Sequence, residues 1–213
     1  MNYIGIDFSL NNTAVTIFNN GIYKFYVFPN VYEMYNKKGG VQSKFIVYDK
    51  LSKNNIIAVK PYIREKLNRN YNEEQHFKLF KANELADKII DIIPKDESVE
   101  IALEGFSYGS SGQSEIDLIM FNTILRGKLY QMKNVVLNIY SPKTIKKFAG
   151  SGNANKQFML EKFKEEKLIG NTFFDYVSST NEYIKGKNLL ILSPITDIID
   201  SYFACKLLQH ITK

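Results

Sequence analysis

Four acidic residues lie in or at the end of apolar segments, where burying an unpaired carboxylate costs free energy. Asp7 lies in the middle of one apolar stretch, and Glu104 closes another. Asp197 and Asp200 belong to a third, ITDIIDSYFACKLL, and their spacing of three places both side chains on one face of a helix. A buried carboxylate with no partner is strongly unfavourable, so such acids are normally paired or bound to a metal. These four acids are therefore the candidate catalytic and metal-binding residues.

The chemistry that such acids support is hydrolysis assisted by hard cations. Carboxylates that converge from several elements hold two Mg²⁺ or Mn²⁺ ions about 4 Å apart, which suits cleavage of a phosphodiester. The chain has only His76, His210 and Cys205 for a softer site, which argues against a His/Cys metal cage. Each acid alone also has a simpler explanation. Asp197, four residues after Ser193, would favour the positive N-terminal end of a helix without any metal.

The elements that must position these acids follow from apolar periodicity. The first three predicted strands are separated by Asn-rich turns, which indicates an antiparallel meander. Later strands alternate with helices, which is typical of an α/β mixed sheet flanked by helices. The predicted strands are Tyr3–Ser9, Thr13–Phe18, Ile22–Phe28, Val99–Leu103, Val135–Tyr140 and Leu189–Leu192. The predicted helices are Glu73–Ile93, Glu115–Met132, Lys143–Phe148, Asn153–Lys167 and a last one that ends at about His210.

Local signals give the helix starts and one insertion. Ser141-Pro142 and Ser193-Pro194 are typical of an N-cap followed by proline in the first turn. The segment from about 31 to 71 fits no regular pattern, and we expect an inserted hairpin or extended loop with short β-like runs at Lys44–Tyr48 and Ile56–Val59. The prediction is a single domain, 1–213, that carries this basic insertion.

Charge is segregated along the chain. The 213 residues carry a formal net charge of +6, from 28 basic and 22 acidic side chains. Residues 36–71 hold nine basic and two acidic residues, and residues 141–168 hold seven and three, so the rest of the chain is net acidic. Such segregation indicates a polyanion as partner, although solvated loops are the simpler reading of either segment. Arginine, which forms bidentate hydrogen bonds with guanine, is far less frequent than lysine. A nucleic acid is therefore expected to be bound through its phosphates and recognised by its shape.

Other classes of protein are disfavoured by composition. No apolar run reaches the roughly 18 residues of a membrane span. The beginning, MNYIGIDFS, lacks the basic region of a signal peptide, and the single Cys205 excludes an intramolecular disulfide. We therefore expect a cytoplasmic protein, in the host cytoplasm if it is phage-encoded.

Several motifs resemble those of the RuvC-type Holliday-junction resolvases, which belong to the RNase H-like nuclease superfamily. The stretches are GIDFS at Gly5–Ser9, LEGF at Leu103–Phe106 and DIID at Asp197–Asp200. The segment SPKTIKK…GSGNANK, which ends at Lys156, is similar to the family's P-x-x-(I/V)-K…G-x-G-x-A-x-K segment. The resemblance covers about 2–20 and 98–209, and it leaves 31–71 and 172–187 unexplained.

The resemblance implies a homodimeric, Mg²⁺-dependent endonuclease with an RNase H-like fold, which nicks four-way DNA junctions in pairs. It implies no membrane partner and no nucleotide cofactor, and Mn²⁺ is expected to substitute for the two Mg²⁺ ions. The helix predicted at Glu115–Met132 occupies the family's dimer position. One family lysine matches Lys156, and the other falls at Lys146 or Lys147. The implied metal ligands are Asp7, Glu104, Asp197 and Asp200, with Lys156 also catalytic, and the implied DNA contacts are Lys143, Lys146, Lys147, Lys156, Phe106 and Tyr108.

Three other functions remain open from the sequence. A flap, single-strand or relaxed branched-DNA endonuclease would use the same acids. The opening GIDFSLNNTAVTIF also resembles the phosphate-1 segment of sugar kinases and actin-like ATPases, which need a second lobe that 213 residues can hardly supply. A DNA-binding module without catalysis would keep the acids for structure alone.

Overall fold

The computed structural model describes residues 1–30, 43–63, 68–106, 112–185 and 190–212. The strands are β1 (Asn2–Asp7), β2 (Asn12–Asn19), β3 (Ile22–Pro29), β4 (Ala58–Val59), β5 (Val99–Glu104), β6 (Val135–Tyr140), β7 (Ile184–Lys185) and β8 (Leu190–Ile191). The helices are α1 (Ser43–Lys53), α2 (Tyr71–Ile90), α3 (Gln113–Gln131), α4 (Pro142–Ala149), α5 (Lys156–Glu165), α6 (Thr172–Ser179) and α7 (Ile195–Ile211).

Six strands form one mixed sheet, in the order β4-β3-β2-β1-β5-β6. β1, β2 and β3 pair antiparallel, whereas β5 pairs parallel with β1, and β6 pairs parallel with β5. The short β4 adds a parallel strand beside β3, and β7 and β8 form a separate ribbon. This arrangement confirms the predicted α/β fold, a mixed sheet of a three-stranded meander plus parallel strands, flanked by helices.

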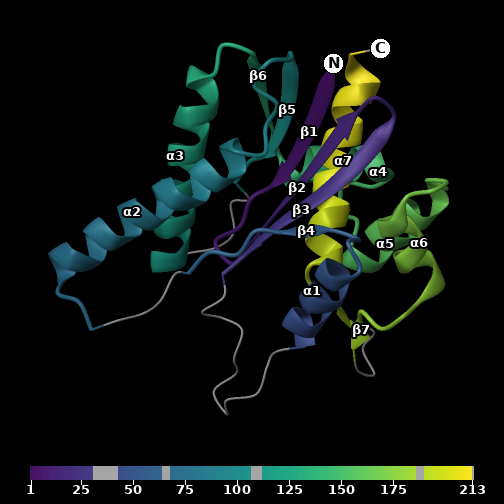
Figure 1. Cartoon of the computed structure of the whole chain (residues 1–213), viewed down its shortest axis with the longest axis horizontal. Coiled ribbons are helices and arrows are strands. Elements are labelled where there is room, and N and C mark those ends of the chain that lie inside the picture. Colours follow the sequence, from purple (N-terminus) through teal and green to yellow (C-terminus); the bar gives the residue numbers. More distant parts are fainter. Residues whose placement is uncertain (31–42, 64–67, 107–111, 186–189, 213) are drawn as a thin grey trace.

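The sheet is the middle of three layers (Figure 1). α2 and α3 cover one face, where their apolar side chains form a core with Ile4 and Ile6 of β1. α7 covers the other face, together with α4 and α5. Successive side chains of a strand point to opposite faces, so Gly5 and Asp7 face the α7 side. The same alternation puts Glu104 of β5 on that side, because Leu103 belongs to the core under α2 and α3.

α7 lies unusually close to β1, and Gly5 makes this approach possible. A Cβ at position 5 would lie 1.9 Å from the Ser201 carbonyl oxygen and 2.4 Å from the Cys205 nitrogen. The Ser201 hydroxyl forms a 2.7 Å hydrogen bond with that of Thr16, and the Cys205 thiol donates to the Tyr3 carbonyl at 3.3 Å. These contacts fix the position of α7 along β1 and β2, and so fix the position of the acids on α7.

The expected insertion contains a helix, which corrects the prediction of a hairpin or loop. Lys44–Tyr48, predicted as a β-like run, belongs to α1, while Ile56–Val59 does end in the short β4. The reason is the spacing of Phe45, Tyr48 and Leu51, three residues apart, which buries one face of a helix. Residues 31–42 and 64–67 of this segment lie outside the described residues.

One of the two predicted helix caps is wrong, and two elements were not predicted. Ser193 does not cap α7, because Pro194 takes the N-cap position and the Ser193 hydroxyl donates to Asp197 instead. Ser141 does cap α4, by accepting from the Thr144 amide at 3.1 Å. α6 and β7 were not predicted, and they lie within the stretch that no motif explained. Among the described residues, no helix has the length and apolarity that crossing a bilayer requires.

Candidate active site

Two of the four acids lie side by side at one end of the sheet. β1 and β5 run parallel in a register that pairs Ile6 with Leu103, so the next residues, Asp7 and Glu104, end the two strands together. Both side chains are partly buried on the α7 side. The two carboxyl groups share a hydrogen bond, which raises the pKa of Asp7 and opposes the rise in the pKa of Glu104.

α7 brings the other two acids to the same place. It packs on β1, β2 and β5, and Asp197 and Asp200 lie in its first two turns. Burial raises the pKa of Asp200 from 3.8 to about 7, with repulsion from Glu104 and then Asp197 as the next causes. The pKa of Asp7 lies well above its ordinary value because of burial, and then because of Glu104, Asp200 and Asp197. These mutual interactions show that the four acids lie near one another, and their binding of a metal stays a prediction.

A cluster of partly buried carboxylates is stabilised by a nearby positive charge. The donor set consists of oxygen atoms alone, which fits a hard cation such as Mg²⁺ or Mn²⁺. As it stands, the described part of the chain contains no group of three or more His, Cys, Asp or Glu side chains arranged as a metal cage. Asp197 accepts hydrogen bonds from Ser193 at 2.7 Å and from Thr196 at 3.0 Å. Both oxygens of Asp197 thus accept hydrogen bonds at the start of α7. The simpler explanation, that Asp197 favours the positive N-terminal end of the helix, places it at the same point.

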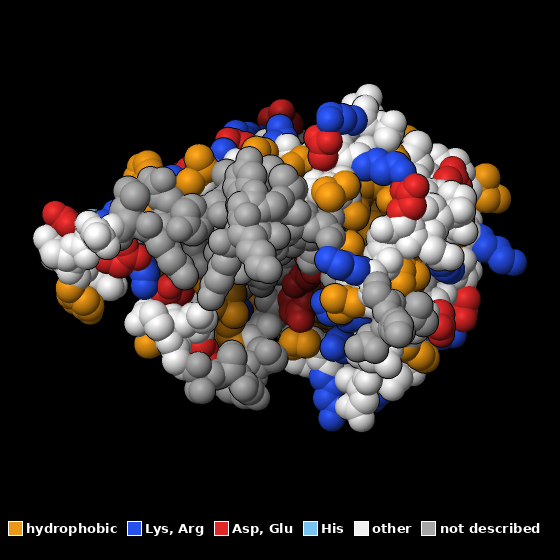
Figure 2. Space-filling model, turned by 90° about the horizontal axis from the view of Figure 1, so that it is seen from below, with side chains coloured by type: hydrophobic (Ala, Val, Ile, Leu, Met, Phe, Trp, Pro, Cys, Tyr) orange, Lys and Arg blue, Asp and Glu red, His pale blue; other side chains and the backbone are white. Residues whose placement is uncertain are grey.

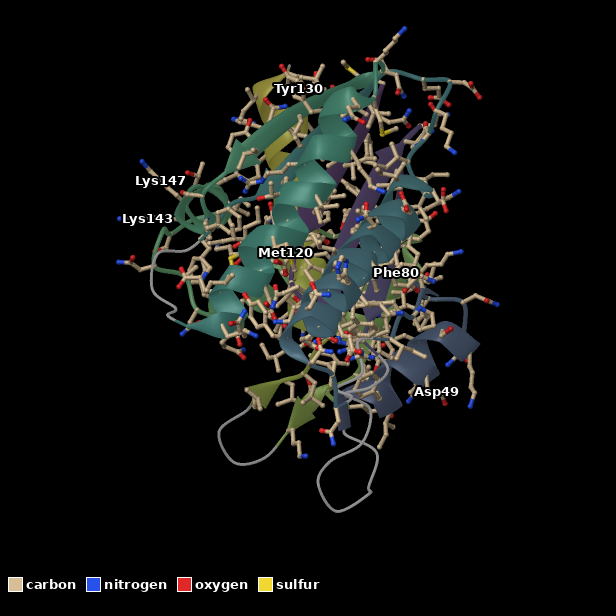
Figure 3. The ribbon with its side chains drawn as sticks, turned by 90° about the vertical axis from the view of Figure 1, so that its left-hand side faces the viewer. Asp49, Phe80, Met120, Tyr130, Lys143 and Lys147 are labelled. Atoms are coloured by element: carbon tan, nitrogen blue, oxygen red, sulfur yellow. The ribbon has the colours of Figure 1, made fainter. Side chains whose placement is uncertain are left out.

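Two lysines face the acids, and the structure decides between the neighbouring candidates on α4. Lys146 is partly buried, and its positive charge opposes the rise that burial causes in the pKa values of Glu104 and Asp200. Lys143 and Lys147 are exposed and point away from the molecule (Figure 3). Lys156, the first residue of α5, donates to the Thr196 hydroxyl at 3.4 Å and also lowers the pKa of Asp200. The lysine next to the acids on α4 is therefore Lys146.

β1 and β5 finish at the end of the sheet that faces the viewer in Figure 2. Seen from below Figure 1, acidic side chains line a recess near the middle of the face, and Lys or Arg side chains lie beside them (Figure 2). β1 runs down toward this face, so it is the end of the sheet at which β1 and β5 finish (Figure 1). A phosphate that entered the recess would meet carboxylates and ammonium groups together.

The aromatic candidates are placed only in part. Phe106, two residues after Glu104, is partly buried, and the Arg126 guanidinium of α3 lies 4.5 Å from the centroid of its ring. This cation–π contact fixes the ring against α3. Tyr108 lies outside the described residues.

Part of the basic insertion is engaged within the molecule. Lys50 pairs with Glu182, Lys53 pairs with Asp49, and Arg69 pairs with Glu74. These three cations are consequently less available to a polyanion than the sequence predicted.

Sequence reasoning missed one side chain beside the acids. Tyr48 of α1 is 3% exposed, and Asp197 and Asp7 contribute, after burial, to raising the pKa of its hydroxyl. The signal that would have found Tyr48 is the three-residue spacing of the apolar face of α1, which predicts a helix that packs inward.

No protein-family model and no curated protein matches the chain. Solved structures do match it, and two of them are RuvC structures. The first is the Thermus thermophilus RuvC structure, which is 12% identical with a TM-score of 0.47 and coverage of 100% of this chain and 97% of that chain. The second is T. thermophilus RuvC in complex with Holliday junction substrate, which is 8% identical with a TM-score of 0.48 and coverage of 99% and 96%.

Proposed function

We propose that this protein is a metal-dependent endonuclease that resolves four-way or other branched DNA junctions by paired nicks. The observation that supports the proposal is the meeting of Asp7, Glu104, Asp197 and Asp200 at the end of β1 and β5, with Lys146 and Lys156 beside them. Bound Mg²⁺ ions, for which Mn²⁺ substitutes, supply an activated water and neutralise charge at the scissile phosphate. The four carboxylates are the groups that would hold two such ions.

The lysines divide into two roles in this proposal. The charges of Lys146 and Lys156 act on Asp200, so these lysines stabilise negative charge that develops on the phosphate during cleavage. Lys143 and Lys147 project from α4, so they contact phosphates farther along the backbone and position the DNA. Phe106, held by Arg126 near the end of β5, is the aromatic side chain available to contact a base where strands part. Tyr108 keeps its proposed DNA-binding role from the sequence alone.

Paired nicks require two active sites, and we propose a homodimer that forms through α2 and α3. These helices carry large apolar side chains that are exposed in one copy of the chain. They include Phe80 at 64%, Ile116 at 60%, Ile119 at 42% and Tyr130 at 85% exposure. Phe80 and Tyr130 lie on the layer that covers one face of the sheet (Figure 3). A second copy that packed on this layer would cover them.

The test is a panel of labelled DNA substrates: four-way junction, flap, single strand and linear duplex, with Mg²⁺ and with EDTA. Wild type is compared with Asp200→Asn and with Asp96→Asn, which changes an exposed acid outside the site. Paired symmetric nicks in the junction, lost in EDTA and in Asp200→Asn but kept in Asp96→Asn, support the proposal. Equal cleavage of flaps or single strands would move the function to a broader structure-selective nuclease. Tight junction binding without cleavage by the wild type would indicate a DNA-binding module.

A further inference from the structure

The insertion supplies a buried tyrosine to the neighbourhood of the acids. Tyr48 lies on α1 and is 3% exposed. Its hydroxyl donates a 2.8 Å hydrogen bond to Oδ1 of Asn12, a residue 36 positions earlier in the chain. Asn12 begins β2 and follows the turn that starts directly after Asp7. The hydroxyl of Tyr48 thus joins the insertion to the segment that leaves the active site.

That turn is itself a connected set of hydrogen bonds. The Asn12 amide donates to the Ser9 hydroxyl oxygen at 3.0 Å. The Thr13 hydroxyl donates to the Ser9 carbonyl at 2.7 Å, and the Ser9 amide donates to the Thr13 hydroxyl oxygen at 3.3 Å. A displacement of Asn12 is therefore transmitted to Ser9, which is two residues from Asp7. The Tyr48 hydroxyl, which does not belong to this set, donates a hydrogen bond to the Asn12 side chain.

α1 also shares a buried core with the part of α7 that carries the other acids. Phe45 and Leu51 of α1 are buried in the same core as Ile195 and Ile198, which flank Asp197. Figure 1 shows α1 below the end of α7 at which that helix begins. Burial, and then the charges of Asp197 and Asp7 among other causes, raise the pKa of Tyr48, in agreement with a hydroxyl close to both acids. α1 is therefore hydrogen-bonded to the turn after Asp7 and shares a core with the start of α7.

We propose that Tyr48 is a positioning residue of the active site, through which α1 holds the turn after Asp7 and fixes the Asp7 carboxylate relative to Asp197. The inference rests on the proposed nuclease function and deepens it. It gives the insertion a role inside the site, as a brace for the acids. Tyr48 donates to Asn12 and is almost fully buried, so it acts on Asp7 through the turn.

The test compares two buried tyrosines, each changed to phenylalanine so that only the hydroxyl is lost. Tyr183 is 0% exposed, and its hydroxyl donates to the Val177 carbonyl at 2.7 Å, in the region of α6 and β7. Both variants should lose similar thermal stability, because each loses one buried hydrogen bond. Tyr48→Phe alone should lower kcat for junction cleavage about tenfold or more at unchanged KM, since partners that orient metal ligands typically contribute about 10- to 100-fold.

A second readout does not depend on cleavage. Mn²⁺ binding to the DNA-free protein, measured by titration calorimetry, should weaken about tenfold in Tyr48→Phe and stay unchanged in Tyr183→Phe. Asn12→Ala should reproduce the effect on kcat, and the double variant should be no worse than either single one, because one hydrogen bond connects the two side chains.

Equal kcat and equal Mn²⁺ affinity in Tyr48→Phe and Tyr183→Phe would overturn the positioning role, and so would additive losses in the double variant. Failure of the proposed function gives a different result. A wild type that binds Mn²⁺ without cutting any DNA overturns the nuclease, while Mn²⁺ affinity still decides whether Tyr48 positions the acids.

Discussion

Asp200→Asn should make the metal-free protein more stable at alkaline pH while it removes the activity. The pKa of Asp200 lies at about 7 in the fold, against 3.8 ordinarily, so the folded state binds a proton that the unfolded state has already released. Stability contributed by this group therefore falls as pH rises from about 4 to about 7. Above pH 7, the ionised carboxylate is held among Glu104, Asp197 and Asp7 at a cost in free energy.

The magnitude follows from the two pKa values. A rise from 3.8 to about 7 corresponds to about 4 kcal/mol at pH 8, which is an upper figure because neighbouring carboxyls share the protons. We expect asparagine, which is uncharged, to raise the free energy of unfolding by about 2 to 4 kcal/mol at pH 8 in EDTA. The midpoint temperature would rise by about 5 to 10 °C for a chain of this length. At pH 4 the two proteins should differ by less than about 1 kcal/mol, because Asp200 is then protonated in the fold.

The assay is thermal and urea unfolding of wild type, Asp200→Asn and the exposed control Asp96→Asn, at pH 4 and pH 8. Each is measured in EDTA and in Mg²⁺. Added Mg²⁺ should stabilise the wild type at pH 8 by mass action and should leave Asp200→Asn almost unchanged. If Asp200→Asn is less stable than the wild type at pH 8 in EDTA, the carboxylate is a structural partner of the nearby lysines. That result would refute the argument that the four acids form a site strained by its own charge.

Three further changes test the geometry. Gly5→Ala should destabilise the fold by more than about 3 kcal/mol, because its Cβ would overlap the backbone of α7; Gly127→Ala, with nothing within 4 Å of its Cβ, should be neutral or stabilising in the same urea titration. Lys146→Ala should lower kcat about 100-fold, as expected for a charge beside the reacting phosphate; Lys147→Ala should instead weaken junction binding and reduce its salt dependence, with kcat kept. Ile119→Glu should convert a dimer to monomers in analytical ultracentrifugation while each monomer stays folded, because the side chain is 42% exposed in one copy.

Most of the sheet could be predicted because its pattern is local. The turn at Asn19-Asn20-Gly21 joins two strands of alternating apolar residues, and β6 has the bounds Val135–Tyr140 that the sequence predicted. Parallel strands after the meander could be predicted from the alternation of strands and helices, whereas the pairing of β1 with β5 was found only in the structure. The insertion was harder because α1 is weakly amphipathic, with three lysines and two serines among its apolar residues.

The candidate site divides in the same way. Asp7, Glu104 and Asp200 could be proposed as candidates because a charged side chain in an apolar segment is informative on its own. Lys146 could not be separated from Lys147, because the choice depends on which side of the short α4 meets Glu104. That depends on the angle at which α4 packs on α7, a tertiary quantity that no local pattern encodes.

The role proposed for Tyr48 could not be predicted from any local sequence pattern. Its residue type and its helical position are ordinary for a core aromatic, and nothing in its local sequence relates it to Asp7. The relation exists because Asn12 pairs with Pro29 across the meander, and the chain then leaves β3 through the insertion and returns as α1 beside the same turn. An insertion that returns to the point where a catalytic strand ends contributes side chains to the site through topology. For this reason the segment that the motifs left unexplained is the place where the structure adds most to the proposed mechanism.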